Sequence, residues 1–384
     1  MKIKLKSAGC IGVVAAAFVG QVAWAQVTLP AQISWTAYDV GSAGYNQAVA
    51  IGSALKNELK VDLRVLPGKN DVSRQVPLRA RQVQFSATGV GASYLAQEGV
   101  LDFGAKTWGP QEVRVLMTAN ADSNLTVGVA ADLGIKNFAD LRGKRVAYIL
   151  GSPSLNENVT AILTFANLSW DDVKKVEFPG FGQSWDGIIN NQVDAAFATT
   201  TSGKAYQLEA SPRGIFWPPL PHNDKEGWKR LQDKAPFFVP NVATEGAGLS
   251  KEKPNEGAAY PYPILIAYAD QNAELAYNMT KAMVTLYPKY QGSAPGINGW
   301  ALERQRFEWA VPYHDGAIRY FKEIGKWTDT HQKHNDNLVK RQQVLKAAWA
   351  EAVASKVGDD QFSKNWMAVR AKRLEAAGLP VVYR

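Results

Sequence analysis

The stretch from Ile33 to Leu59 reads ISWTAYDVGSAGYNQAVAIGSALKNEL. It predicts a strand over 33–40, a turn of small residues over 41–44, and an amphipathic helix that begins near Tyr45. A helix N-terminus carries unpaired backbone N–H groups and partial positive charge, and a Gly/Ser turn lets an anion approach those groups closely. On this stretch alone, glycines that only shape a strand-to-helix turn explain the pattern equally well.

The same pattern recurs later in the chain, after Gly151. The first set of predicted elements has strands at 33–40, 61–66 and 82–88, with a helix at 72–80. The second set has strands at 144–150, 175–178 and 192–199, with a helix at 183–190. In each set, the Gly of a Gly-Ser pair and the Val of a Gln-Val pair are 42 residues apart (41 to 83 and 151 to 193). An ordered series at matched spacing favours an internal repeat over chance.

Each set predicts a β-α-β-α-β unit, in which right-handed crossovers make the strands parallel and place helices on the sheet faces. Two such units predict an α/β protein of two lobes, each built on a mainly parallel sheet flanked by helices. Ligands of open α/β sheets bind beyond the carboxyl ends of the strands. Those ends carry a Gly-Ser turn, a Pro-Gly turn and an Ala-Thr segment in both lobes, so we expect a cleft lined by six small-residue loops.

The connections between the lobes are predicted to be extended. Strands at 113–117 and 125–130 lead into the second lobe, and a proline-bearing strand at 260–268 returns to the first. Residues 211–258, rich in Pro, Gly and aromatic side chains, are expected to be irregular. Helices are expected to start at 137–140 and to cover 273–286, 302–310, 316–324, 335–353 and 360–377. We therefore place lobe I at 26–125 and 263–325, lobe II at 126–262, and a helical C-terminal extension at 326–384.

The first 25 residues have the features of an export signal. Lysines at positions 2, 4 and 6 precede an apolar run at 11–19, and Ala23-Trp24-Ala25 predicts cleavage after Ala25. The apolar run is too short to span a bilayer, and we expect a product that is not itself embedded in the membrane. The one cysteine, Cys10, lies within the signal, which excludes a disulfide or thiolate metal site from the mature chain.

The formal net charge of +8 is unevenly distributed along the chain. The three signal lysines account for +3, and the segment from Lys326 to the C-terminus, with eleven Lys/Arg and six Asp/Glu, for +5. The body of the chain, 26–325, is thus neutral, which gives little support to nucleic-acid binding. The basic tail suits either a docking element or a clasp across the first lobe.

Four motifs in order resemble the solute receptors of tripartite ATP-independent periplasmic (TRAP) transporters of the TAXI kind, the TRAP-associated extracytoplasmic immunogenic proteins. They are Gly41-Ser42-Ala43-Gly44-Tyr45 (similar to Gly-Gly-x-Tyr-Tyr), LRGKRV at 141–146 (L-x-G-K-x-V), QVDAAF at 192–197 (G-x-x-D-A-x-F) and PYHDGAIRYFKE at 312–323 (P-x-H-x-G-A-x-x-Y-x-x-E). The resemblance covers about 33–326. Gly151-Ser152-Pro153-Ser154 departs from the family's usual Gly-Ser-Gly-Thr run.

This resemblance implies a two-lobed periplasmic binding protein fold (type II-like) with a cleft between the lobes. It implies a periplasmic receptor that captures a small organic anion, such as a carboxylate, an amino acid or a 2-oxo acid, and delivers it to TRAP-type membrane permease subunits. Such a receptor is not an enzyme and needs no cofactor, metal or catalytic residue. A ligand-sensing subunit on the same scaffold is an alternative, and a secreted hydrolase is a third.

The predicted ligand contacts centre on the two Gly-Ser turns, because their N–H groups and hydroxyls suit a carboxylate. The Pro-Gly turns and the strand ends contribute further contacts. The predicted ligand-binding residues are Gly41, Ser42, Ala43, Gly44, Tyr45, Gly68, Lys69, Asn70, Thr88, Gly89, Gly151, Ser152, Pro153, Ser154, Asn156, Phe181, Thr199 and Thr200. Trp185 is a further candidate for an aromatic wall, with core packing as the alternative.

Other chemistries find little support in the sequence. Residues 182–187, GQSWDG, miss the G-x-S-x-G hydrolase pattern by one position. His331 and His334 are spaced i, i+3 without a third metal-ligand pattern. His314 stands at a helix start within a family-like motif, and we interpret it as structural.

Overall fold

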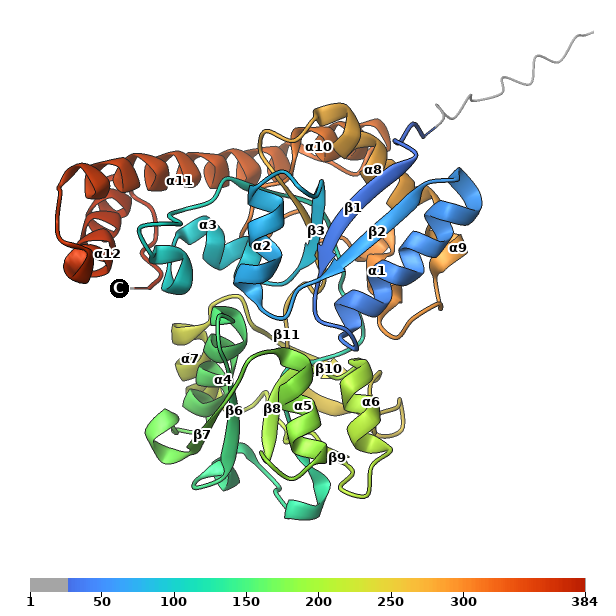
Figure 1. Cartoon of the computed structure of the whole chain (residues 1–384), viewed down its shortest axis with the longest axis vertical. Coiled ribbons are helices and arrows are strands. Elements are labelled where there is room, and N and C mark those ends of the chain that lie inside the picture. The colour runs from blue at the N-terminus through green and yellow to red at the C-terminus, as the bar shows by residue number, and fades with distance from the viewer. Residues whose placement is uncertain (1–26, 384) are drawn as a thin grey trace, which may run out of the picture.

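The computed structural model describes residues 27–383, which form two α/β lobes and a helical extension (Figure 1). The sheet of lobe I has the strand order β2-β1-β3-β12-β4, and the sheet of lobe II has the order β7-β6-β8-β5-β9. The lobe I strands are β1 Gln32–Ala37, β2 Asp62–Pro67, β3 Phe85–Thr88, β4 Val113–Thr118 and β12 Ile264–Tyr268. The lobe II strands are β5 Leu125–Ala130, β6 Arg145–Ile149, β7 Lys174–Phe178, β8 Ala195–Thr199 and β9 Ile215–Phe216.

The pairing within each sheet confirms the predicted repeat. Strand β1 pairs in parallel with β2 and β3, and β6 pairs in parallel with β7 and β8. The strands that enter from the opposite lobe run the other way: β12 is antiparallel to β3 and β4, and β5 is antiparallel to β8 and β9. Both lobes are therefore mainly parallel sheets, with an antiparallel strand where the chain crosses over.

Helices cover the faces of both sheets (Figure 1). Lobe I has α1 Ala43–Ala54, α2 Asp71–Arg79, α3 Ala96–Glu98, α8 Ala273–Thr285, α9 Tyr287–Tyr290 and α10 Asp315–Glu323. Lobe II has α4 Pro153–Phe165, α5 Phe181–Ile189, α6 Gly203–Glu209 and α7 Lys225–Lys234. The extension consists of α11 Asp329–Ala354 and α12 Asp359–Ala376. Among residues 27–383, none of these helices combines the length and apolarity that a bilayer crossing requires.

Two predicted segments were wrong. Residues 211–258 are not irregular throughout, because they contain β9, α7 and the antiparallel pair β10 Val239–Ala243 and β11 Asn255–Ala259. Asp224 starts α7 by accepting a hydrogen bond from the Gly227 amide, a local signal that the Pro-rich composition obscured. Residues 302–310 form only a short turn at Leu302–Arg304, since the Gln305 side chain hydrogen-bonds to the backbone of Thr118.

The two crossing segments lie side by side between the lobes. The chain leaves lobe I between β4 and β5 and returns between β11 and β12. The Ala119 amide donates to the Pro263 carbonyl (2.8 Å), and the Tyr262 amide donates to the Ala119 carbonyl (2.8 Å). This pair of crossings is the covalent connection about which the lobes can move relative to each other.

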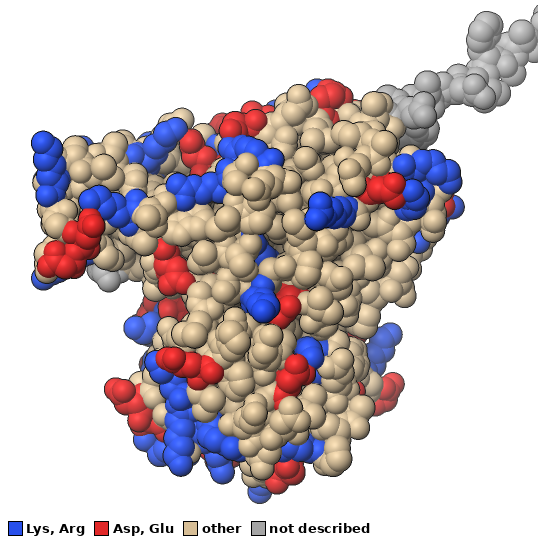
Figure 2. Space-filling view, viewed as in Figure 1, with Lys and Arg blue, Asp and Glu red and all other residues tan. Residues whose placement is uncertain are grey.

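The C-terminal extension packs against lobe I. Figure 1 shows α11 lying along lobe I, with α12 folded back beneath its far end. The extension is anchored by Glu98, which is fully buried and paired with Arg341 and Arg370. The indole of Trp366 adds a hydrogen bond to the Gly99 carbonyl (2.6 Å). On the face shown in Figure 2, acidic and basic side chains are interspersed over both lobes.

Candidate ligand-binding site between the lobes

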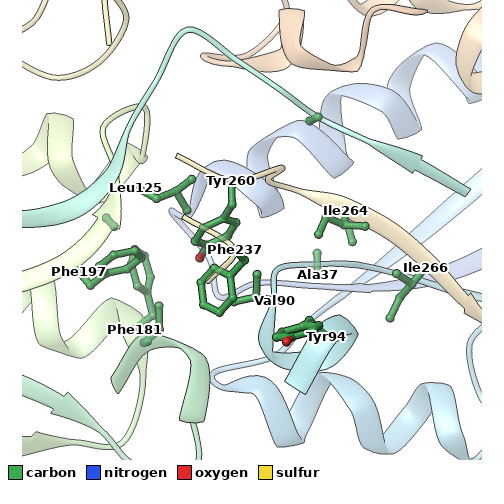
Figure 3. Packing of buried hydrophobic residues seen from close by; sticks show 14 of the residues in the cluster. Ala37, Val90, Tyr94, Leu125, Phe181, Phe197, Phe237, Tyr260, Ile264 and Ile266 are labelled. Atoms are coloured by element: carbon green, nitrogen blue, oxygen red, sulfur yellow. The ribbon is translucent and has the colours of Figure 1, made fainter. Parts of the chain in front are cut away.

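A small cavity lies between the lobes, beyond the carboxyl ends of the parallel strands. Both lobes and the returning crossing segment contribute to its wall. Its lining residues are Tyr38, Ser42 and Ala43 from lobe I, Leu125, Leu155, Phe181, Phe197, Ala198, Thr199 and Ser202 from lobe II, and Tyr260 and Tyr262 from the crossing. Figure 3 shows Phe181, Phe197 and Leu125 on one side of Tyr260, with Ala37 and Ile264 on the other.

The walls of this cavity approach one another closely. The centres of water-sized spheres can occupy only about 20 Å³ of it, which is about the room that one water molecule needs. In this arrangement of the lobes the cavity has no room for an organic molecule larger than a few atoms.

The lining is mostly aromatic and aliphatic, with hydroxyl groups as its polar part. Among the described lining residues, the ionisable side chains are tyrosines. Burial raises the pKa of Tyr38 to about 12, against the opposing charge of Arg74, and burial also raises the pKa values of Tyr260 and Tyr262 well above that of a free tyrosine. All three phenols are thus neutral at physiological pH and serve as hydrogen-bonding groups rather than anions.

The start of α1 brings backbone donors to the cavity. Ser42 is the N-cap of α1, and its hydroxyl accepts a hydrogen bond from the Tyr45 amide (3.2 Å). First-turn amides have no carbonyl partner within their own helix. The Gly44 amide is directed at the Tyr262 hydroxyl oxygen, whereas Ala43 lines the cavity itself. Ser42 and Ala43 of the first Gly-Ser turn therefore lie at the cavity wall, and their contact with a ligand stays a prediction.

The second Gly-Ser turn has a different role. The carboxylate of Asp71, at the start of α2 in lobe I, accepts a hydrogen bond from the Ser154 amide at the start of α4 (2.9 Å). The Ser152 hydroxyl also points to this carboxylate (3.5 Å). Donors that the sequence assigned to a ligand are thus engaged by a carboxylate of the protein itself.

A second carboxylate of lobe I reaches α5 in the same way. Asp39 accepts a hydrogen bond from the Gly182 amide in the first turn of α5 (3.1 Å). At α6, the Gly41 carbonyl accepts hydrogen bonds from the Lys204 amide (3.1 Å) and the Ser202 hydroxyl (3.3 Å). Three helices of lobe II therefore present their N-termini to acceptors of lobe I, an arrangement that the partial positive charge of a helix start favours.

The Pro-Gly turn of lobe I lies in the contact between the lobes and does not line the cavity. The Lys69 carbonyl accepts a hydrogen bond from the Phe181 amide (3.4 Å), and the Asn70 amide group donates to the Leu150 carbonyl (3.2 Å). Gly151 accepts a hydrogen bond through its carbonyl from the Val72 amide (3.5 Å). Gly68 contacts the Arg74 side chain, and Pro153 is the first residue of α4.

Five further predicted residues lie away from the cavity wall. Tyr45 lines a separate surface groove between α1 and β2, because one helical step beyond Gly44 turns its side chain away from the cleft. The Asn156 side chain bonds to both the amide and the carbonyl of Ile149 (2.8 Å each), and the Thr200 hydroxyl bonds to the Glu245 carbonyl (2.8 Å). Thr88 and Gly89 lie behind the cavity, with Gly89 close to the Tyr38 hydroxyl.

Of the predicted residues, Ser42, Ala43, Phe181 and Thr199 line the cavity. The lining residues that the prediction lacked are Tyr38, Leu125, Leu155, Phe197, Ala198, Ser202, Tyr260 and Tyr262. Two of these residues, Tyr260 and Tyr262, could have been predicted from the sequence. They belong to a crossing segment, and a segment that connects the lobes passes the cleft between them. Trp185 is a core residue that packs behind Phe181 (ring centroids 6.4 Å apart).

His314 is the N-cap of α10, with its ring accepting from the Gly316 amide (3.1 Å), which agrees with a structural role. Within residues 27–383, no cluster of three or more His, Cys, Asp or Glu has a metal-binding arrangement. The predicted signal peptide lies outside the described residues.

Two α/β lobes, two crossing segments and an enclosed cavity between the lobes define a periplasmic binding protein fold. The model of the NMT1-like family matches residues 36–325, and the chain belongs to that family.

Several solved structures are similar to this chain at low sequence identity. A protein from Bordetella bronchiseptica RB50 is 15% identical, with 80% of this chain and 98% of that chain covered and a TM-score of 0.45. The alkanesulfonate-binding protein SsuA from Xanthomonas axonopodis pv. citri, bound to MOPS, is 14% identical, with 92% and 99% covered and a TM-score of 0.43. PhnD1 from Prochlorococcus marinus, in complex with methylphosphonate, is 9% identical, with 78% and 100% covered and a TM-score of 0.42.

Proposed function

We propose that this protein is an exported solute receptor that encloses a small organic carboxylate between its lobes and delivers it to a TRAP-type membrane permease. The observation that carries the proposal is the cavity, whose wall is shared by both lobes and by a crossing segment. Opening at the crossings admits a ligand, and closure buries it and creates a lobe arrangement that a permease can distinguish from the open one.

The carboxylate of the ligand is proposed to bind at the start of α1. The Ala43 amide is a donor from lobe I, and Thr199 and Ser202 line the cavity from lobe II. In the present arrangement the Ser202 hydroxyl donates to the Gly41 carbonyl (3.3 Å), and the Thr199 hydroxyl lies within hydrogen-bond distance of the Ser123 and Thr201 hydroxyls, so these two groups would exchange those partners for the ligand. Charge-assisted hydrogen bonds of this kind contribute about 1.5–3 kcal/mol each. The apolar part of the ligand would pack against Phe181 and Phe197. In this arrangement the predicted residues of the second Gly-Ser turn and of the Pro-Gly turn do not contact the ligand. They instead form hydrogen bonds between the two lobes in the closed form.

The direct test is titration of the mature chain with a panel of small carboxylates, amino acids and 2-oxo acids. Calorimetry measures binding, and tryptophan fluorescence reports it because Trp185 packs behind Phe181. A folded protein that binds no member of a broad panel would contradict the proposal. Loss of cellular uptake of the identified ligand on gene deletion supports transport, whereas unchanged uptake with a lost transcriptional response supports a sensing subunit.

The site is tested by Ser42→Asp. Aspartate is also a good N-cap, so α1 is retained while a negative charge is placed beside the cavity. We expect anion affinity to fall at least tenfold because the like charge faces the ligand. Asn272→Asp is the matched control, since Asn272 caps α8 in the same way and does not line the cavity. Equal affinities of Ser42→Asp and the control would remove α1 from the site.

A further inference from the structure

Asp71 places a carboxylate inside the contact between the lobes. Its side chain is fully buried, and it forms an ion pair with the buried Arg74 of the same helix. Its second oxygen accepts from the Ser154 amide of the opposite lobe (2.9 Å) and lies 3.5 Å from the Ser152 hydroxyl. This is the set of donors that a bound anion would use at a helix start.

This carboxylate lies next to the cavity. The guanidinium of Arg74 stacks on the Tyr38 ring, 3.4 Å from its centroid, and Tyr38 is a residue of the cavity wall. Leu155, which follows Ser154, is also a wall residue. The Asp71 charge contributes to the raised pKa values of the three tyrosines in the wall, after the larger effect of burial.

The charges around the cavity are therefore already balanced. Arg74 neutralises Asp71, and the wall holds no Lys, Arg, Asp or Glu among the described residues. Asp39 engages the start of α5 through the Gly182 amide (3.1 Å), so that helix end is also occupied. A ligand with two carboxylates would meet donors for one at α1, while the other would be buried without a counterion near Asp71.

We infer that Asp71 is a specificity-determining residue, an internal carboxylate that restricts the receptor to ligands with a single carboxylate. The inference rests on the proposed function, because it assigns a ligand class to the same cavity. It also explains the second Gly-Ser turn, which binds an anion as its sequence predicts, but the anion is the Asp71 carboxylate and not the ligand. The Nε atom of Arg74 has no hydrogen-bond partner among the described residues, so loss of the Asp71 charge would leave a buried cation able to attract a second ligand carboxylate.

The experiment compares acids of equal chain length, butyrate against succinate and pentanoate against glutarate, by calorimetry on the mature chain. The wild type is expected to bind each monocarboxylate at least 100-fold more tightly than its dicarboxylate. Asp71→Asn keeps the shape of the side chain and an acceptor for Ser154 but removes the charge. We expect it to reduce this ratio at least tenfold, mainly through tighter dicarboxylate binding.

Asp62→Asn is the matched control, because Asp62 pairs with Lys56 on the exposed surface of lobe I. It is expected to leave the ratio unchanged. Should Asp71→Asn fail to fold, Asp71→Ser is a second neutral replacement that leaves the Arg74 charge in place, and the ratio is again expected to fall at least tenfold.

The outcomes separate this inference from the proposed function. Comparable wild-type affinity for succinate and butyrate would overturn the inference and leave the receptor function in place. A ratio that persists in the folded variant would do the same. Absence of binding by every carboxylate in both the pairs and the broad panel would refute the proposed function, and the inference with it.

Discussion

Glu98→Gln is expected to loosen the C-terminal extension from lobe I. Glu98 is fully buried and is the common anion for two cations of the extension. Its two oxygens accept from the Nε and an Nη of Arg341 (2.7 Å each), and one of them also pairs with Arg370. Glutamine has nearly the same volume, so the substitution removes the charge without opening a cavity.

The magnitude follows from the burial of the triad. Removing one partner of a buried ion pair costs about 3–5 kcal/mol, because the remaining charge is left without compensation. Burial by itself would raise the pKa of Glu98, but its hydrogen bonds and charge interactions with Arg341 and Arg370 outweigh burial and hold that pKa below its usual value of 4.5. The folded-state pKa is thus depressed, so this stabilisation is present above about pH 4.5 and is lost as the pH falls through the lowered value.

The assay is urea unfolding at pH 7 and at pH 4, with limited proteolysis of the connection before α11 as a local readout. The matched control is Glu112→Gln, which also breaks a link between lobe I and α11, to Lys346 (2.8 Å). That pair is exposed (42% and 69% of the side chains), and its loss should cost below about 1 kcal/mol. Two results would refute this reasoning. One is an equal loss of unfolding free energy in the two variants, and the other is a loss in Glu98→Gln, relative to the wild type, that is larger at pH 4 than at pH 7.

Three further outcomes are expected. Gly128→Ala should destabilise the protein by about 1–3 kcal/mol in urea unfolding, because an added Cβ would lie 2.8 Å from the Trp217 ring; an unchanged midpoint would contradict this. Asp39→Asn should weaken ligand binding about two- to fivefold in calorimetry, since it removes a charge from the start of α5, worth about 0.3–1 kcal/mol. Burial lowers the pKa of His314, so the folded state resists its protonation and stability should fall as the pH drops below about 6.5. His314→Asn retains a capping side chain and should reduce this pH dependence in thermal unfolding.

The repeat could be predicted because its signals are local. Each Gly-Ser pair follows the first strand of a unit, and each Gln-Val pair precedes the third strand. Short motifs next to each element therefore indicate the order of the elements. Parallel pairing of β1 with β2 and β3, and of β6 with β7 and β8, then follows from the handedness of the crossovers. The weakest predictions fell where a distant contact decides the structure, as when Gln305 binds the backbone of Thr118.

The wall of the cavity was harder to predict than the fold. Its aromatic residues come from strand ends and a crossing segment, and an aromatic side chain at such a position suits a core equally well. Trp185 and Phe181 illustrate this, since both lie on α5 and only Phe181 reaches the cavity. The face of a helix that meets the opposite lobe is set by how the two lobes are placed against each other. The periodicity of apolar residues within one helix shows which face is buried, but it does not show whether that face meets the core of its own lobe or the other lobe.

The two Gly-Ser turns show what a helix-start motif can specify. In both lobes the pattern predicted donors for an anion; the structure places the Asp71 carboxylate at the start of α4 and the cavity at the start of α1. The motif describes the donor and not the source of the acceptor, because a carboxylate from 83 positions away in the chain satisfies the same amides as a ligand would. A repeat that duplicates a binding turn therefore need not duplicate a binding site. In this protein, one copy is proposed to hold the ligand, while the other holds the lobes together and, through the charge of Asp71, determines which ligands the first copy accepts.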